Sequence, residues 1–366
     1  MGAVVTDKAR AAMTGCPMNL RAPCIALLLT TPLLSREKTD LIIMNNGDHV
    51  TGEIKGLDAG VLYVSLDYVN GTVSFYWSKV ARLDSNQLFI VKTQDGSVYK
   101  GTLNTAEAPE GRPVRIEIAE KPDDKLLIDR SHMIQMSETS ENFWKRFSGE
   151  ISFGTIYSKG NHSTQYNLAS GTEYLRERWS AEASYSSNLS SSSGATASTR
   201  NQLNLSGTHL LHWNNYFYSG FASFRQSSEQ GISLQTGLGG GIGRYLKNTN
   251  NATISVLGGL GWQSTNYTPA TVIPSTQKVT AAMIAAEVKF FRFSKTNLSL
   301  TATVFPALSE PGRVYFNTNA SYYVKLFSNL SWNVSFYGNW DNQPPSHLSG
   351  SDYGSSSGLT WTFGLK

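Results

Sequence analysis

The stretch Leu330–Trp340, LSWNVSFYGNW, decides the fold class. Apolar residues occupy every second position except at Gly338, and Ser, Asn or Tyr fill the positions between them. Successive side chains of a β-strand point to opposite faces, so the alternation predicts a strand with one apolar and one polar face. The stretch Gly358–Leu365, GLTWTFGL, repeats this pattern.

About twelve such runs, each of roughly ten residues, follow one another between Phe147 and Leu365. A secreted β-sandwich would also alternate, but its strands average only about 5–6 residues. A strand that crosses a membrane obliquely needs about 9–11 residues. Hydrocarbon cannot hydrogen-bond to free backbone groups, so a spanning sheet must close on itself. The sequence therefore predicts an all-β protein with a closed antiparallel transmembrane β-barrel of about 12 strands.

The connections between the runs alternate between two kinds. One set is tight and comprises residues 176–178, 212–215, 247–250, 294–297 and 327–329. The other set is mostly long and polar, with only the first hairpin at 158–161 being short, and comprises residues 190–194, 227–231, 264–277, 307–312 and 341–354. Short turns at one end and long loops at the other are typical of outer-membrane barrels. An even number of strands places both ends of the barrel at the short-turn, periplasmic side.

The start of the chain predicts export. Residues 1–35 have the pattern of a secretory signal peptide, with Arg21 ahead of the apolar run Ala22–Leu34, and Met18 offers an alternative start. Both cysteines, Cys16 and Cys24, fall inside this segment. An exported chain without further cysteines needs no disulfide framework if a barrel holds it together.

Residues 36–140 predict a small periplasmic β-domain, SH3-like or Sm-like, ahead of a barrel over residues 141–366. Two segments, 47–54 and 96–103, share their glycine spacing, and each begins at a hairpin signal, Asn46-Gly47 or Asp95-Gly96. A domain of about 100 residues can bury its own core.

Composition excludes several classes of protein. Only 16% of the residues are charged, yet the mean hydropathy is −0.26, which excludes a bundle of apolar transmembrane helices. A hydrophobic content of 40% excludes ordinary disorder. The net charge of +4 is too small for an electrostatic nucleic-acid binder, so no nucleic-acid partner is predicted.

Seven charged residues within the predicted strands fall on the alternate positions that form the polar face. A Lys or Arg on the lipid face would cost about 2–4 kcal/mol at the membrane midplane, so these side chains are expected to point into the lumen. The predicted lumen charges are Glu150, Glu173, Glu182, Arg225, Glu287, Lys289 and Lys325. They fit either a salt-bridged, closed interior or a narrow pore, because twelve strands lie between filled and open barrels.

The sequence gives little support to an enzyme, and no catalytic, cofactor or metal residue is predicted. No His or Cys cluster has zinc spacing, and no Asp-rich loop resembles a calcium site. Gly237–Gly243 lacks the Lys-Ser/Thr of a phosphate loop and lies in an alternating run. A lipase-like site at the rim would need a Ser, a His and an orienting carboxamide or carboxylate to converge. The candidates are Asn161-His162-Ser163 in the first external turn and Asp341 and His347 in the last external loop.

Four stretches match the pattern of a known family: Leu41–Asp48, Gly52–Ile54, Phe147–Gly154 and Gly358–Lys366. They resemble the YdiY-like salt-induced outer-membrane proteins, a family of unknown function. The resemblance implies a Gram-negative outer-membrane β-barrel without an established activity. It implies no catalytic residues.

The expected function is that of an outer-membrane barrel with a structural or small-solute channel role, linked to salt or osmotic stress by the resemblance alone. Its expected partners are outer-membrane lipid and, during biogenesis, the barrel-assembly machinery. One alternative is a binding module, in which residues 36–140 hold peptidoglycan or a periplasmic protein and the barrel is an anchor. A rim-site lipid or peptide hydrolase is the other alternative.

Overall fold

The computed structural model describes residues 38–69, 71–106, 113–121, 124–139, 146–158, 163–191, 197–211, 214–268, 275–292, 296–327, 329–345 and 348–363. The predicted signal peptide, with Cys16, Met18 and Cys24, lies outside the described residues, as do Asn161, His162 and His347. Among the described residues, no helix is long and apolar enough to cross a membrane.

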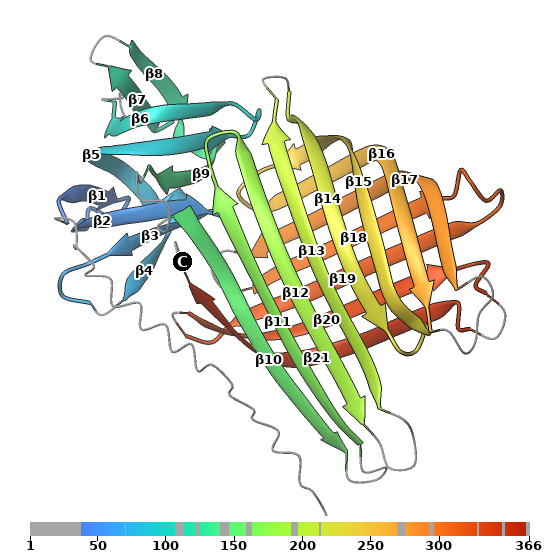
Figure 1. Ribbon diagram of the computed structural model, residues 1–366. Coiled ribbons are helices and arrows are strands. Elements are labelled where there is room, and N and C mark those ends of the chain that lie inside the picture. Colours follow the sequence, from blue (N-terminus) through green and yellow to red (C-terminus); the bar gives the residue numbers. More distant parts are fainter. Residues whose placement is uncertain are drawn as a thin grey trace, which may run out of the picture. The chain divides into compact units, whose positions relative to one another are not determined.

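The N-terminal domain is a curled β-domain (Figure 1). Two single-turn 3₁₀ helices, η1 (Trp77–Lys79) and η2 (Arg130–His132), interrupt its strands. The strands are β1 (Asp40–Met44), β2 (His49–Asp58), β3 (Val61–Ser65), β4 (Thr72–Tyr76), β5 (Val80–Thr93), β6 (Val98–Thr105), β7 (Arg115–Lys121), β8 (Asp124–Asp129) and β9 (Met133–Glu138). β1 pairs with β2 and β5, and β9 pairs with the same two strands, so these four strands close into a small ring.

The two hairpin signals form the turns that they predict. Gly47 joins β1 to β2 at φ +88°, and Gly96 joins β5 to β6 at φ +84°. Both values lie in the left-handed region that glycine adopts without a steric penalty. Asp95 supports the second turn, because its carboxylate accepts hydrogen bonds from the Ser97 amide (3.2 Å) and the Ser97 hydroxyl (2.9 Å).

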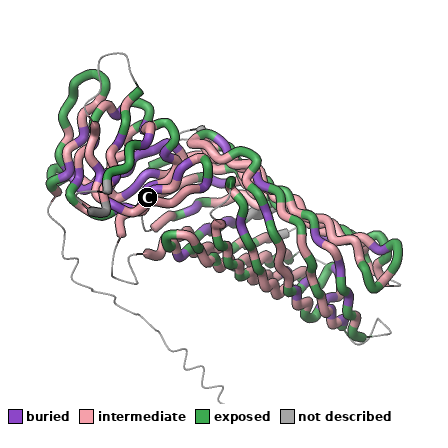
Figure 2. The backbone as a smooth tube through the Cα atoms, turned by 90° about the horizontal axis from the view of Figure 1, so that it is seen from above, coloured by how far each residue is buried: buried purple, intermediate pink, exposed green. Residues whose placement is uncertain are grey.

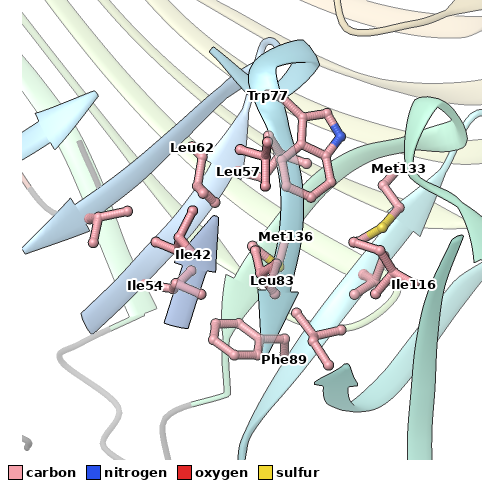
Figure 3. Close-up of a cluster of buried hydrophobic side chains, with 14 of the residues drawn as sticks. Ile42, Ile54, Leu57, Leu62, Trp77, Leu83, Phe89, Ile116, Met133 and Met136 are labelled. Atoms are coloured by element: carbon pink, nitrogen blue, oxygen red, sulfur yellow. The ribbon is translucent and has the colours of Figure 1, made fainter. Parts of the chain in front are cut away.

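The domain has its own hydrophobic core, shown in Figure 3. Ile42, Leu83 and Phe89 are fully buried in it. Trp77 packs at its margin and donates its indole N–H to the Arg130 carbonyl at 2.9 Å. The buried Asp40 accepts hydrogen bonds from the Ile54 amide (2.8 Å) and the Ser85 hydroxyl (2.5 Å). These bonds offset the cost of removing a carboxylate from water.

The second part is a closed antiparallel barrel, which in the described residues has twelve strands. They are β10 (Phe147–Ser158), β11 (Ser163–Leu175), β12 (Trp179–Ser191), β13 (Ser198–Leu210), β14 (Tyr216–Ser227), β15 (Ile232–Asn248), β16 (Ala252–Tyr267), β17 (Thr276–Arg292), β18 (Thr296–Pro306), β19 (Val314–Lys325), β20 (Leu330–Asp341) and β21 (Ser351–Phe363). Closure runs through β10 and β21, from Gly149 opposite Phe363 to Phe153 opposite Leu359. The predicted fold class is confirmed.

Two predicted loops differ in the structure. The loop predicted over 341–354 spans only 342–350, because Asp341 ends β20 and β21 begins at Ser351. The loop predicted as long at 227–231 is a tight turn over 228–231, in which the Gly231 amide donates to the Ser228 carbonyl at 3.1 Å. Gly231 has φ +60°, which permits the tight reversal.

The glycine-rich stretch Gly237–Gly243 lies inside β15. A Cβ at Gly241 would collide with the carbonyl oxygen of Gly258 on β16, so the glycines allow two backbones to approach closely. Strand length also varies around the barrel. β15, β16 and β17 have 17, 16 and 17 residues, against 12 or 13 in β10–β14.

Candidate functional site: the barrel lumen

The barrel has two chemically distinct faces. Contacts between strands that are not neighbours identify the inner face, because only inward side chains can meet across the lumen. Tyr323 of β19 donates its hydroxyl to Glu150 of β10 at 3.1 Å, and Arg200 of β13 bonds Asp352 of β21. Following the strand register from these residues places all seven predicted lumen charges on the inner face.

Exposed apolar side chains occupy the outer face. The large exposed hydrophobic residues of the barrel strands that have a register partner fall on outward positions, among them Ile284 (62% exposed), Leu260 (61%) and Phe153 (56%). Buried hydrophobic residues are concentrated in the N-terminal domain, while Figure 2 shows buried positions in both parts of the chain. A barrel that is apolar outside and polar inside has the surface chemistry of a membrane-spanning barrel.

Five of the predicted charges form one group near the short turns, which we call the turn-side acidic group: Glu150, Glu173, Glu182, Glu287 and Lys289. Glu173 lies directly opposite Glu182 in the register. Glu182 interacts electrostatically with the other four members. Lys289 lies 2.8 Å from Glu287, and their side chains are 41% and 32% exposed. The group is therefore hydrated and carries a net negative charge. Lys325 lies on the inner face at the end of β19.

A buried ion pair lies toward the long-loop end. Arg200 bonds Asp352 and donates to Gln202 Oε1 at 2.8 Å, and its guanidinium lies 4.2 Å from the ring centre of Tyr337. The Ser227 hydroxyl donates to the same carboxylate at 3.1 Å. Arg200 and Asp352 are each only 5% exposed. The Arg200–Asp352 ion pair links β13 to β21 across the lumen.

A second arginine, Arg313, directly precedes β19 at the long-loop end of the barrel. It donates to Asp341 Oδ2 (2.6 Å), Asp341 Oδ1 (3.1 Å) and Glu310 Oε2 (2.7 Å). Burial acts to lower the pKa of Arg313, but the bonds to Asp341 and Glu310 outweigh it and hold that pKa above its ordinary value. Asp341, a residue of the lipase-like rim site considered from the sequence, is therefore bound to an arginine.

Arg225, the remaining predicted charge, faces small cavities in the lumen. A cavity of about 60 Å³ is lined by Arg225, Gln202, Gln235, Gln263, Tyr315 and Asn317, among others. A neighbouring cavity of about 30 Å³ shares Arg225 and is also lined by Pro344, Pro345 and Leu348. Leu348 packs on Ile232 and Tyr267. Cavities of this size hold only a few water molecules.

The lumen contains functional residues that the sequence analysis did not single out: Arg200, Glu310, Arg313 and Asp352. Alternation places Arg200 on an inward position, so a signal was available for this residue. Asp352 falls in the loop predicted over 341–354, which hid its inward position. Within the described residues, no group of three or more His, Cys, Asp or Glu side chains could hold a metal ion.

Comparisons with known proteins give one family and several solved barrels. The model of the DUF481 family, described as proteins of unknown function, matches residues 151–363. No curated protein matches the chain.

Three solved structures are similar to parts of this chain. The translocator domain of the autotransporter NalP from Neisseria meningitidis has 14% identity and a TM-score of 0.33, over 59% of this chain and 87% of that one. The NanC porin has 9% identity and a TM-score of 0.36, over 59% and 99%. The outer membrane protease OmpT from Escherichia coli has 11% identity and a TM-score of 0.21, over 59% and 96%. The family match covers more than half of the sequence, and the chain therefore belongs to the DUF481 family.

Proposed function

We propose that this protein is an integral β-barrel of a Gram-negative outer membrane. The division of the barrel into an apolar outer face and a charged inner face is the observation that carries the proposal. It meets the requirement that lipid imposes, because the large exposed apolar side chains face outward, where hydrocarbon would contact them, and the predicted lumen charges face inward. Outer-membrane lipid and, during biogenesis, the barrel-assembly machinery are the corresponding partners.

The proposed orientation places the N-terminal domain in the periplasm. β10 begins and β21 ends at the short-turn side of the barrel. Outer-membrane barrels keep their short turns in the periplasm. Residues 36–140, which precede β10, would then emerge on the periplasmic side.

Gel mobility with and without boiling tests the barrel. An outer-membrane fraction should yield a fast-migrating folded band that shifts to the full apparent mass on heating. Recovery of the protein in the soluble fraction without detergent would refute the proposal.

For the lumen we propose passage of small solutes through a narrow polar path. The hydrated turn-side acidic group and a loop-side cavity of about 470 Å³, lined by Arg200, Tyr337 and Asp352 among others, support this role. The cavities of about 60 and 30 Å³ beside Arg225 make the path narrow. Planar-bilayer recording should show small conductance steps, and Leu348→Ser should enlarge them by removing an apolar contact of the 342–350 loop. Silence of both proteins across salt and voltage would leave a structural role.

The link to salt rests on the family resemblance and predicts higher protein levels after growth in raised NaCl.

A second candidate function is binding by the N-terminal domain. Tyr68 is 75% exposed and Leu127 is 51% exposed, and neither belongs to the core of the domain. Leu126, next to Leu127 in the last strand of the sheet, is also exposed, so the edge strand β8 offers an apolar contact point for a partner. Co-sedimentation of the full-length protein with peptidoglycan, and pull-down from periplasmic extract, should weaken in Tyr68→Ser and Leu127→Ser. Unchanged capture by both variants would contradict this role.

The rim hydrolase stays a prediction. His162→Ala and His347→Ala should be compared with the unaltered protein in esterase and protease assays, and activity lost with either change would favour it.

A further inference from the structure

Arg225 is a half-buried cation whose Nε atom has no hydrogen-bond acceptor among the described residues. It lies at the inner face of β14, between Gln202 of β13 and Gln235 of β15. The Nε atom itself is buried. A buried guanidinium normally pairs with a carboxylate, because an unpaired charge in the interior is costly.

The nearest carboxylates are engaged by other arginines. Asp352 is bound by Arg200 and Ser227, and Asp341 is bound by Arg313 through both of its oxygens. Asp352 and Asp341 act on Arg225 only through space, and Arg200 opposes them with its own positive charge. The vicinity of Arg225 therefore lacks a direct counter-charge.

The 60 Å³ cavity beside Arg225 combines polar and apolar walls. No carboxylate is among the described residues that line it. Gln263, Asn317 and Asn339 contribute carboxamides, which can donate N–H groups, while Val279, Ala281 and Phe305 form an apolar wall. Such a space suits a molecule with a negatively charged oxygen pair at one end and a small apolar group at the other.

We propose that this cavity binds a small monocarboxylate of the size of formate or acetate. The planar fork of a guanidinium matches a carboxylate with two parallel hydrogen bonds, which are stronger than hydrogen bonds between neutral groups. The cavity volume restricts the ligand to a few non-hydrogen atoms. The inference rests on the proposed function in treating the lumen as a path for solutes, and it names the class of solute.

Calorimetric titration of the full-length, detergent-folded protein with sodium acetate tests the site. Sulfate balances the sodium concentration, and the neutral amide acetamide is the uncharged probe. Arg225→Gln should weaken acetate binding at least tenfold. Arg244→Gln is the matched control, because Arg244 lies on the outer face of β15, over the Tyr216 ring, and should bind acetate like the unaltered protein. Acetamide should not bind.

Arg225→Lys separates charge from shape. Lysine keeps the positive charge but loses the fork, so this variant should retain weak binding and lose its preference for acetate over chloride. It also serves if Arg225→Gln does not fold. Equal acetate affinity in the unaltered protein and in both Arg225 variants would overturn the proposal. So would binding of acetamide as tight as acetate, or absence of acetate binding by protein that shows the heat-modifiable band. Absence of that band would instead count against the proposed membrane barrel.

Discussion

Arg313 shows how single residues fix the long-loop end of the barrel. The arginine is only 3% exposed and joins the 307–313 loop to the end of β20 through Glu310 and Asp341. Gln277 of β17 extends the cluster by donating to Glu310 at 3.0 Å. The guanidinium of Arg313 therefore helps to hold the 307–313 loop, the end of β20 and, through Glu310, β17 together.

Replacing Arg313 with Met should strongly destabilise the barrel. The substitution leaves two partly buried carboxylates without their cation, and breaking a buried ion pair typically costs about 3–5 kcal/mol. The temperature at which the folded gel band disappears should fall clearly below that of Arg244→Gln, which removes an arginine from the outer face. Equal temperatures for the two variants would show that the cluster adds nothing to stability.

Asp95 makes the β5–β6 hairpin sensitive to acid. Partial burial acts to raise the pKa of Asp95, but hydrogen bonds from Thr93 and Ser97 outweigh it and hold that pKa below its ordinary value. A carboxyl group whose pKa is lower in the folded state stabilises that state above the unfolded pKa of about 3.9. This contribution is lost as the pH falls through the lower, folded value.

Asp95→Asn should therefore destabilise the hairpin at neutral pH by roughly 1 kcal/mol, the usual worth of a hydrogen bond. Hydrogen exchange of β5 and β6, compared between the two proteins at the same pH, measures the effect. The difference should be present at pH 7 and shrink below about pH 4. A difference that persists undiminished in acid would exclude the charge as its cause.

Among the elements, the seam between β10 and β21 determines whether the barrel closes. The Ser152 and Thr360 hydroxyls lie 2.6 Å apart in this seam and are buried. Gly358 passes so close to β10 that a Cβ there would collide with the Phe153 carbonyl oxygen. Small inward residues, Ser152 and Gly154 on β10 and Gly358 and Thr360 on β21, allow the first and last strands to approach closely.

Gly358→Val should block this closure. The added side chain would separate β21 from β10 and expose unpaired backbone groups to lipid, where they cannot be satisfied. The folded, heat-modifiable fraction should drop severely. Gly258→Val is the control, because a Cβ at Gly258 meets nothing within 4 Å. Normal folding of Gly358→Val would mean that the seam tolerates a wider spacing.

The elements also show what the sequence could predict. Two-residue alternation locates the strands from Phe147 onward and assigns a face to each charge, because both follow from local geometry. It does not indicate that β9 pairs with both β2 and β5, nor that Arg200 bonds Asp352, 152 positions away. Such pairings depend on sheet closure. The sequence predicts a long loop at 227–231 because polar composition does not reveal the tight reversal at Gly231.

At the scale of the whole molecule, the outer face should reject charge while the inner face accepts it. Ile284 lies midway along β17 and points outward, whereas Thr301 of β18 points inward, opposite Glu287. Ile284→Lys should cost about 2–4 kcal/mol in a bilayer, and Thr301→Lys clearly less. Denaturant unfolding from lipid vesicles compares the two. A larger loss for Thr301→Lys would invert the assignment of the faces.

The unequal strand lengths have a consequence for the cell surface. A strand of 12 residues, tilted by about 40°, already spans roughly 30 Å of hydrocarbon. At the long-loop end, β17 continues beyond its last register pair with β18, Ile284 opposite Val304. Outward residues change there from Ile284 to Lys278 on β17 and from Trp262 to Ser264 on β16. In the proposed orientation, antibodies, phages and proteases that reach this side of the barrel would meet rigid, hydrogen-bonded β-sheet that projects beyond the lipid headgroups.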